Sequence, residues 1–204
     1  MMPQRRSTSA AVRTCSTLES PLSMDVALIG GSFNPPHVGH LLAAHFVRAT
    51  EPVDAVWLVP ADHHPFGKQL APFAHRLRMC ELLCADASGW LRVSDVEHAL
   101  GGQGRTVDTL RHLAARFPDV RWTLVVGSDI LSEFSSWKEP DAIRSLARLV
   151  VLNRAGHPSP TAVGPPMAHV SSSEVRAALA RGEDVSHLVP RSVLAYAKTH
   201  GLYG

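Results

Sequence analysis

Residues 30–40, GGSFNPPHVGH, combine residue types that suit the binding of a phosphate. They follow the apolar run VALI, which is typical of a buried strand, so the chain must turn sharply before the next helix begins. Gly30 and Gly31 let a ligand approach the backbone, and the following helix offers free amide groups and the positive end of its dipole. His37 and His40 share one face of the first helical turn, where they can donate hydrogen bonds to anionic oxygens, more strongly when charged. The stretch predicts an anion site; the open alternative is that both histidines only cap and pack the helix.

A second stretch with anion-binding chemistry lies near the C-terminus, at residues 170–176 (VSSSEVR). Ser171 and Ser172 open a predicted helix, and Arg176 lies on its first turn. Hydroxyl groups, free helix amides and a guanidinium together suit a phosphate. Ser171 and Glu174 also have the spacing of an ordinary capping box, which needs no ligand.

Apolar runs alternate with amphipathic stretches along the chain. Strands are predicted over 26–30, 55–60, 91–97, 122–127 and 149–153, and helices over 38–50, 72–87, 106–117, 141–148, 172–182 and 190–200. This alternation predicts an α/β fold, a doubly wound, mainly parallel sheet in a single domain over residues 25–204. Ligands of such sheets bind beyond the carboxyl ends of the strands, where this chain carries glycines and polar residues.

The composition excludes several classes of protein. The chain has 204 residues, of which 45% are hydrophobic, and a formal net charge of +2. No apolar run reaches the roughly 18 residues of a membrane span, so no membrane association is expected. The excess positive charge lies in residues 1–24, and the balanced remainder gives no reason to expect a nucleic-acid partner.

Residues 1–24 are rich in Ser, Thr and Arg and show no apolar periodicity. We expect a disordered N-terminal extension there. A transit peptide and a true start at Met24 are the alternatives.

The cysteines and histidines favour neither a disulfide framework nor a metal site. The three cysteines are Cys15, Cys80 and Cys84, and the last two, four residues apart in a predicted helix, are interpreted as small buried side chains rather than metal ligands. The 12 histidines are scattered, so a zinc protein is not expected. A reducing, cytoplasmic location fits this cysteine usage.

Both anion-binding stretches resemble the signatures of one superfamily. Residues 37–40, His-Val-Gly-His, resemble the His-x-Gly-His motif of a nucleotidyltransferase superfamily, and residues 170–176 resemble its second motif, Ile-Ser-Ser-Thr-x-Ile-Arg. Further stretches resemble the nicotinate-nucleotide adenylyltransferases of that superfamily: 64–68 (HPFGK), 76–79 (RLRM), 105–110 (RTVDTL), 127–129 (GSD) with Trp137, 188–190 (LVP) and 202–203 (LY). The resemblance covers about residues 26–203 and implies a Rossmann-like nucleotidyltransferase fold.

The resemblance implies a reaction in NAD biosynthesis. ATP and nicotinate mononucleotide would give nicotinate adenine dinucleotide and pyrophosphate, with Mg²⁺ accompanying ATP. The phosphate oxygen of the mononucleotide would attack the α-phosphorus of ATP in line, without a covalent enzyme intermediate. Since that oxygen is already an anion, the reaction needs positioning and charge neutralisation rather than a general base.

The resemblance also implies site residues. Catalytic roles fall to His37, His40 and Arg176, and ATP binding adds Gly30, Gly31, Ser32, Phe33, Ser171, Ser172 and Lys68. For the mononucleotide, Trp137 would offer its ring to the pyridine, and Thr106 with backbone amides near Trp137 would contact the carboxylate. Asp129 would bind a ribose hydroxyl or orient the loop. The alternatives are a core aromatic for Trp137, a helix cap for Asp129 and a solvated side chain for Lys68. Arg154 could reach ATP or form a surface ion pair.

Two departures from the family pattern stand out. Asn34 occupies a position where the family often carries Asp, and the pair His63-His64 leaves the alignment of Lys68 open by about one residue. Rival functions are a nicotinamide-nucleotide adenylyltransferase, a phosphopantetheine adenylyltransferase and a non-catalytic nucleotide-binding module. A homo-oligomer is also left open.

Overall fold

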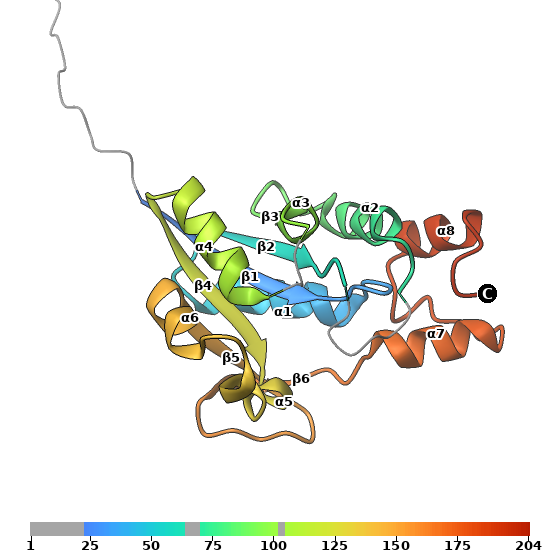
Figure 1. Ribbon diagram of the computed structural model, residues 1–204. Coiled ribbons are helices and arrows are strands. Elements are labelled where there is room, and N and C mark those ends of the chain that lie inside the picture. Colours follow the sequence, from blue (N-terminus) through green and yellow to red (C-terminus); the bar gives the residue numbers. More distant parts are fainter. Residues whose placement is uncertain (1–22, 64–69, 102–104) are drawn as a thin grey trace, which may run out of the picture.

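The computed structural model describes residues 23–63, 70–101 and 105–204. Its centre is a parallel sheet in the order β3-β2-β1-β4-β5-β6 (Figure 1). The strands are β1 (Met24–Gly31), β2 (Ala55–Pro60), β3 (Leu91–Val93), β4 (Val120–Gly127), β5 (Arg148–Arg154) and β6 (Ala162–Met167). The strand order reverses between β1 and β4, and ligands of doubly wound sheets bind at such a switch point. The predicted fold class is confirmed.

Alternate residues of β1 pack into cores on opposite faces of the sheet. Ala27 and Ile29 join a core with α1 (Val38–Thr50), while Val26 and Leu28 join another with α4 (Thr106–Arg116). The first core also includes residues of α2 (Phe73–Cys84), α7 (Ser172–Ala180) and α8 (Arg191–Thr199), and the second includes Ile143 of α6 (Pro140–Leu146). Figure 1 shows α4 in front of the sheet and α1 behind it. A sheet covered on both faces explains why its strands are nearly continuous apolar runs.

Most predicted elements are present, and the exceptions have physical reasons. The stretch 91–97 is a strand only over Leu91–Val93, and a short helix, α3 (Val96–Ala99), follows it. Strand β6 was not predicted because AVGPPM contains a glycine, which weakens strand propensity, and two prolines, which sheets tolerate mainly in edge strands such as β6. The short α5 (Ser128–Leu131) and the 3₁₀ turn η1 (Phe134–Ser136) were also missed.

The predicted extension falls mostly on residues 1–22, which lie outside the described residues. Strand β1 begins at Met24, one residue before the predicted domain boundary, and that boundary stays a prediction. None of the helices in the described ranges has the length and hydropathy needed to span a bilayer.

Candidate active site

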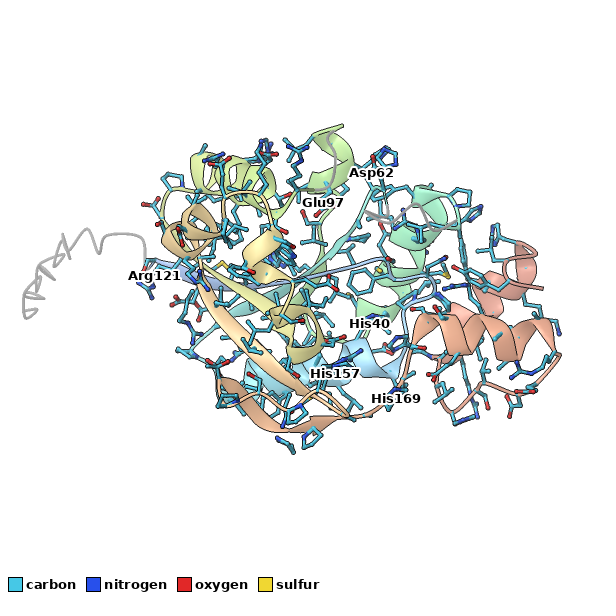
Figure 2. All side chains as sticks on the ribbon, turned by 60° about the horizontal axis from the view of Figure 1, so that its bottom comes forward. His40, Asp62, Glu97, Arg121, His157 and His169 are labelled. Atoms are coloured by element: carbon cyan, nitrogen blue, oxygen red, sulfur yellow. The ribbon has the colours of Figure 1, made fainter. Side chains whose placement is uncertain are left out.

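A cavity of about 210 Å³ lies where the β1–α1 turn meets the start of α7. Its lining comes from the β1–α1 turn and α1 (Ser32, Phe33, Asn34, His37, His40), from the start of α7 (Val170, Ser171, Ser172, Ser173, Arg176), and from Leu70 and Arg154. Figure 2 shows His40 at the start of α1, beside the segment that carries His169 and leads into α7. The two stretches predicted to bind anions, more than a hundred residues apart, therefore form one site.

The turn between β1 and α1 is held by its own residues and by the C-terminal part of the chain. Phe33 has φ 46° and a buried side chain, and the Asn34–Pro35 peptide is cis. The Val38 amide donates to the Leu188 carbonyl at 2.9 Å. A Cβ at Gly39 would lie 3.0 Å from the His37 ring, so glycine at this position lets the ring pack against the helix.

The two histidines form a stacked pair. Their ring centroids are 3.8 Å apart, and the His37 amide donates to Nδ1 of His40 at 3.1 Å. Because that nitrogen accepts, the proton of a neutral His40 ring is assigned to Nε2, which can donate to a ligand. Nδ1 of His37 is buried and has no hydrogen-bond partner among the described residues.

Neither histidine is charged near neutral pH in the free protein. Burial lowers the pKa of His37 to about 4, with a smaller contribution from the charge of Arg154. Burial and the neighbouring His37 lower the pKa of His40 well below its usual range. The positive charge that would strengthen their hydrogen bonds is therefore absent from both histidines before a ligand binds. A bound anion would raise both pKa values.

The serines of the second stretch are already engaged within the protein. Ser171 Oγ accepts from the Glu174 amide at 3.1 Å and the Glu174 carboxylate accepts from the Ser171 amide at 3.2 Å, so the capping box is formed. Ser172 Oγ donates to the Pro35 carbonyl at 2.8 Å. The groups that remain for an anion are the first-turn amides of Ser172 and Ser173, which have no acceptor within a helix, and the Arg176 guanidinium.

Arg76, to which the sequence assigns no role, is almost fully buried, with 1% of its surface exposed. It donates to the carbonyls of Ser32, Ala61, Asp62 and Ala71 at 2.7–3.1 Å. It therefore ties the phosphate turn to the loop that follows β2. Its sequence signal was a charged residue on the buried stripe of α2, in line with Met79, Cys80 and Leu83.

The residues predicted for the mononucleotide lie outside the cavity lining, at the carboxyl end of β4 and the start of α4. Thr106 opens α4, and Trp137 follows η1, half-buried, with its ring centroid 5.2 Å from that of Phe134. Asp129 Oδ1 lies 3.7 Å from Nε of Arg154, which itself lines the cavity. A Cβ at Gly127 would collide with the Asp129 carboxylate, so the Gly-Ser-Asp sequence lets this side chain fold back over β4.

Lys68 lies outside the described residues, so its predicted contact with ATP stays a prediction. Over the described ranges, no group of three or more His, Cys, Asp or Glu side chains could hold a metal ion. The cavity lining contains no carboxylate, so the residues present do not fit a resident Mg²⁺.

The comparisons with known proteins agree with this geometry. Residues 28–178, which include both anion-binding stretches, match the cytidylyltransferase-like family model. A protein of Myxococcus xanthus (strain DK1622) named "Probable nicotinate-nucleotide adenylyltransferase" is 58% identical over 182 residues, covering 89% of this chain and 96% of the relative. A protein of Thermus thermophilus with the same name is 37% identical over 186 residues, covering 88% of this chain and 100% of the relative.

A solved structure supports the fold. The Plasmodium falciparum nicotinic acid mononucleotide adenylyltransferase complexed with NaAD has a TM-score of 0.76 and 20% sequence identity, over 88% of this chain and 97% of that chain. The chain belongs to the cytidylyltransferase-like family and, within it, to the nicotinate-nucleotide adenylyltransferases.

Proposed function

We propose that the protein transfers the adenylyl group of ATP to nicotinate mononucleotide, giving nicotinate adenine dinucleotide and pyrophosphate in NAD biosynthesis. The observation that carries the proposal is the convergence of the helix starts of α1 and α7 on one cavity. The Myxococcus relative, 58% identical, carries the name of this activity over nearly its whole length.

The chemistry needs little from the protein beyond placement and charge. A phosphate oxygen of the mononucleotide forms the new bond to the α-phosphorus, and the bond from that phosphorus to the bridging oxygen breaks as pyrophosphate leaves. The attacking oxygen is an anion, so no proton has to be removed. Aligning the two substrates and stabilising the spreading negative charge then supply the rate enhancement.

We assign the triphosphate to the cavity between the two helix starts. His40 Nε2 and the His37 ring donate to phosphate oxygens, and Arg176 with the first-turn amides of α7 neutralises the leaving pyrophosphate. A Cβ at Gly30 would meet no protein atom within 4 Å, so the glycine keeps open a space outside the protein. That space suits a ligand passing close to the backbone. Gly31, Ser32 and Phe33 belong to the same turn, and the last two line the cavity. Lys68 is an additional cation in this proposal.

The mononucleotide then lies over the carboxyl end of β4. Trp137 is half-buried and retains a face for the pyridine ring, and Thr106 with the nearby backbone contacts the carboxylate. Asp129 binds a ribose hydroxyl, and its ion pair with Arg154 connects this region to the triphosphate cavity. This placement sets the two substrates side by side at the switch point between β1 and β4.

Mg²⁺ enters the proposal as part of the substrate. Triphosphate oxygens and water provide the ligands it prefers, and the cavity itself offers cations and amides instead. The free thiols Cys80 and Cys84 agree with a reducing, cytoplasmic setting.

The test is product identification. Purified protein is incubated with Mg-ATP and nicotinate mononucleotide, and the products are identified by mass spectrometry and by a coupled pyrophosphate assay. Nicotinate adenine dinucleotide and pyrophosphate should appear in equal amounts. Formation of AMP or ADP without the dinucleotide would refute the proposal.

A further inference from the structure

The end of the chain reaches back to the phosphate turn. The Tyr203 hydroxyl donates to Asn34 Oδ1 at 2.7 Å, across 169 positions of sequence. Asn34 lines the cavity and is 1% exposed. Figure 1 shows the C-terminus on the side of the molecule that carries α7 and α8. The proposed reaction gives residues Leu202 and Tyr203 no role.

Asn34 connects Tyr203 to Arg176, an arginine that lines the cavity. Asn34 Oδ1 also accepts a hydrogen bond from the Ala71 amide at 3.1 Å, just before α2 begins. The Asn34 carbonyl accepts from Nη1 of Arg176 at 2.6 Å, and the other guanidinium nitrogen, Nη2, donates to Ser173 at 3.3 Å. The orientation of residue 34 therefore sets where the Arg176 guanidinium lies in the cavity.

We propose that Tyr203 is a positioning residue for the nucleotide: through Asn34, its hydroxyl fixes Arg176 where the triphosphate of ATP binds. The inference rests on the proposed function only for the identity of that nucleotide. Asn34 Oδ1 accepts hydrogen bonds from the Tyr203 hydroxyl and the Ala71 amide, although the side chain is neutral. Residue 34 therefore adds no negative charge to the cavity.

Two features of Tyr203 support a positioning role. Its φ of 73° is uncommon for a residue other than glycine and persists where surrounding contacts hold it. Burial raises the pKa of the hydroxyl well above its usual range, and this outweighs the opposite effect of the Arg176 and Arg76 charges. The hydroxyl therefore keeps its proton and remains a donor at neutral pH.

The chain offers a matched pair of variants, because its tyrosines are Tyr196 and Tyr203. Tyr196 also donates or accepts one side-chain hydrogen bond, with His75 at 3.0 Å, but on the face between α2 and α8. The probe is a non-hydrolysable ATP analogue with a methylene between the α- and β-phosphates, and its Kd is measured by calorimetry. Tyr203→Phe should weaken binding about threefold to tenfold, the range expected for one hydrogen bond. Tyr196→Phe should leave the Kd unchanged.

A double-mutant cycle shows whether the effect passes through Arg176. In an Arg176→Ala background, Tyr203→Phe should cause no further loss of analogue binding. The KM for nicotinate mononucleotide should stay within about twofold of wild type in Tyr203→Phe, since the proposed function places that substrate over β4 and not against Arg176.

Three results would overturn the inference: an unchanged Kd in Tyr203→Phe, full additivity in the cycle, or an equal rise in the KM of both substrates that follows a lowered melting temperature. All Kd values are taken at a temperature where thermal unfolding shows each variant to be folded. If wild-type protein binds the analogue but makes no dinucleotide, the proposed function fails while this inference stands.

Discussion

At position 40 the chemistry depends on which ring nitrogen carries the proton. The His37 amide donates to Nδ1 of His40, so the ring offers Nε2–H to the cavity while staying neutral. A neutral donor held in place by the backbone can stabilise charge that develops on a phosphate without first being protonated. The same contact explains the spacing of the pair, because an N-cap amide lies next to the side chain three residues on.

His40→Asn tests this donor directly. The Asn Oδ1 can replace Nδ1 as acceptor for the His37 amide, but no N–H then reaches the position of Nε2. We expect kcat to fall by about 10²- to 10³-fold, with little change in melting temperature. His45→Asn, an exposed histidine on the same helix, is the control and should keep wild-type turnover. Near-normal turnover in His40→Asn would rule out the assigned role.

The buried histidines also predict a pH dependence of stability. The pKa of His37 is about 4 in the folded protein and near 6.5 when unfolded, so the unfolded state binds the proton first as pH falls. The stability contribution of neutral His37 should therefore be fully present above pH 6.5, and the free energy of unfolding should fall by up to about 3 kcal/mol towards pH 4. The lowered pKa of His40 acts in the same direction.

His37→Asn supplies the comparison, because Asn is a good N-cap residue that does not titrate. Denaturant unfolding at a series of pH values should give a shallower slope for this variant than for wild type between pH 6.5 and pH 4. Identical slopes would contradict the buried, neutral state of His37.

At the scale of elements, two ion pairs join α4 to the turn that carries Trp137. Lys138 Nζ lies 3.1 Å from Asp108 Oδ1, and Arg111 binds both carboxylate oxygens of Glu139 at 3.1 and 2.5 Å. Glu139 has φ 52°, so the turn is sharply bent where it is held. The pairs connect α4 to the turn that carries the indole.

Removing both pairs should loosen the mononucleotide site alone. In Asp108→Asn with Arg111→Gln, we expect the KM for nicotinate mononucleotide to rise about twofold to fivefold with the KM for ATP unchanged, as befits exposed ion pairs of modest strength. Arg78→Gln, which removes the exposed pair with Glu81 on α2, is the control. A rise in the KM for ATP of the same size would show that the pairs stabilise the whole protein rather than this site.

At the scale of the whole molecule, the fold brings the starts of α1 and α7 together at one cavity. Strand β6 is the last strand of the sheet and packs next to α1. Gly164 in β6 has φ 75°, and a Cβ there would collide with the Phe46 ring of α1. The chain therefore needs glycine at this edge for both conformation and space.

Gly164→Ala should reduce the free energy of unfolding by about 2 kcal/mol or more, since strain and overpacking act together. Gly182→Ala is matched in φ, at 74°, but meets no atom within 4 Å, and should cost only about 1 kcal/mol. Urea unfolding measures both. Equal losses would mean that the contact with Phe46 adds nothing.

The sequence predicted what depends on local pattern. The glycine turn, the histidine spacing and the start of α7 are each encoded within a few residues. Ser32, both histidines and the start of α7 line one cavity, whereas Gly30 and Gly31 lie outside its lining. Strand β6 escaped prediction because pairing with β5 overrides the poor strand propensity of its prolines. Arg76 and Tyr203 escaped because their partners come from distant segments that only the fold brings together. The serine hydroxyls could not be assigned from spacing, since a cap and a ligand site use the same residues.

The central claim is that the anion cavity holds the triphosphate of ATP for transfer of its adenylyl group to a pyridine mononucleotide. The most direct measurement compares kcat/KM for nicotinate mononucleotide, nicotinamide mononucleotide and phosphopantetheine, with saturating Mg-ATP and pyrophosphate release as the readout. We expect nicotinate mononucleotide to be preferred by at least about 100-fold over the other two, as for a site that hydrogen-bonds a polar group of its substrate. Preference for phosphopantetheine, or no activity with any of the three, would contradict the account.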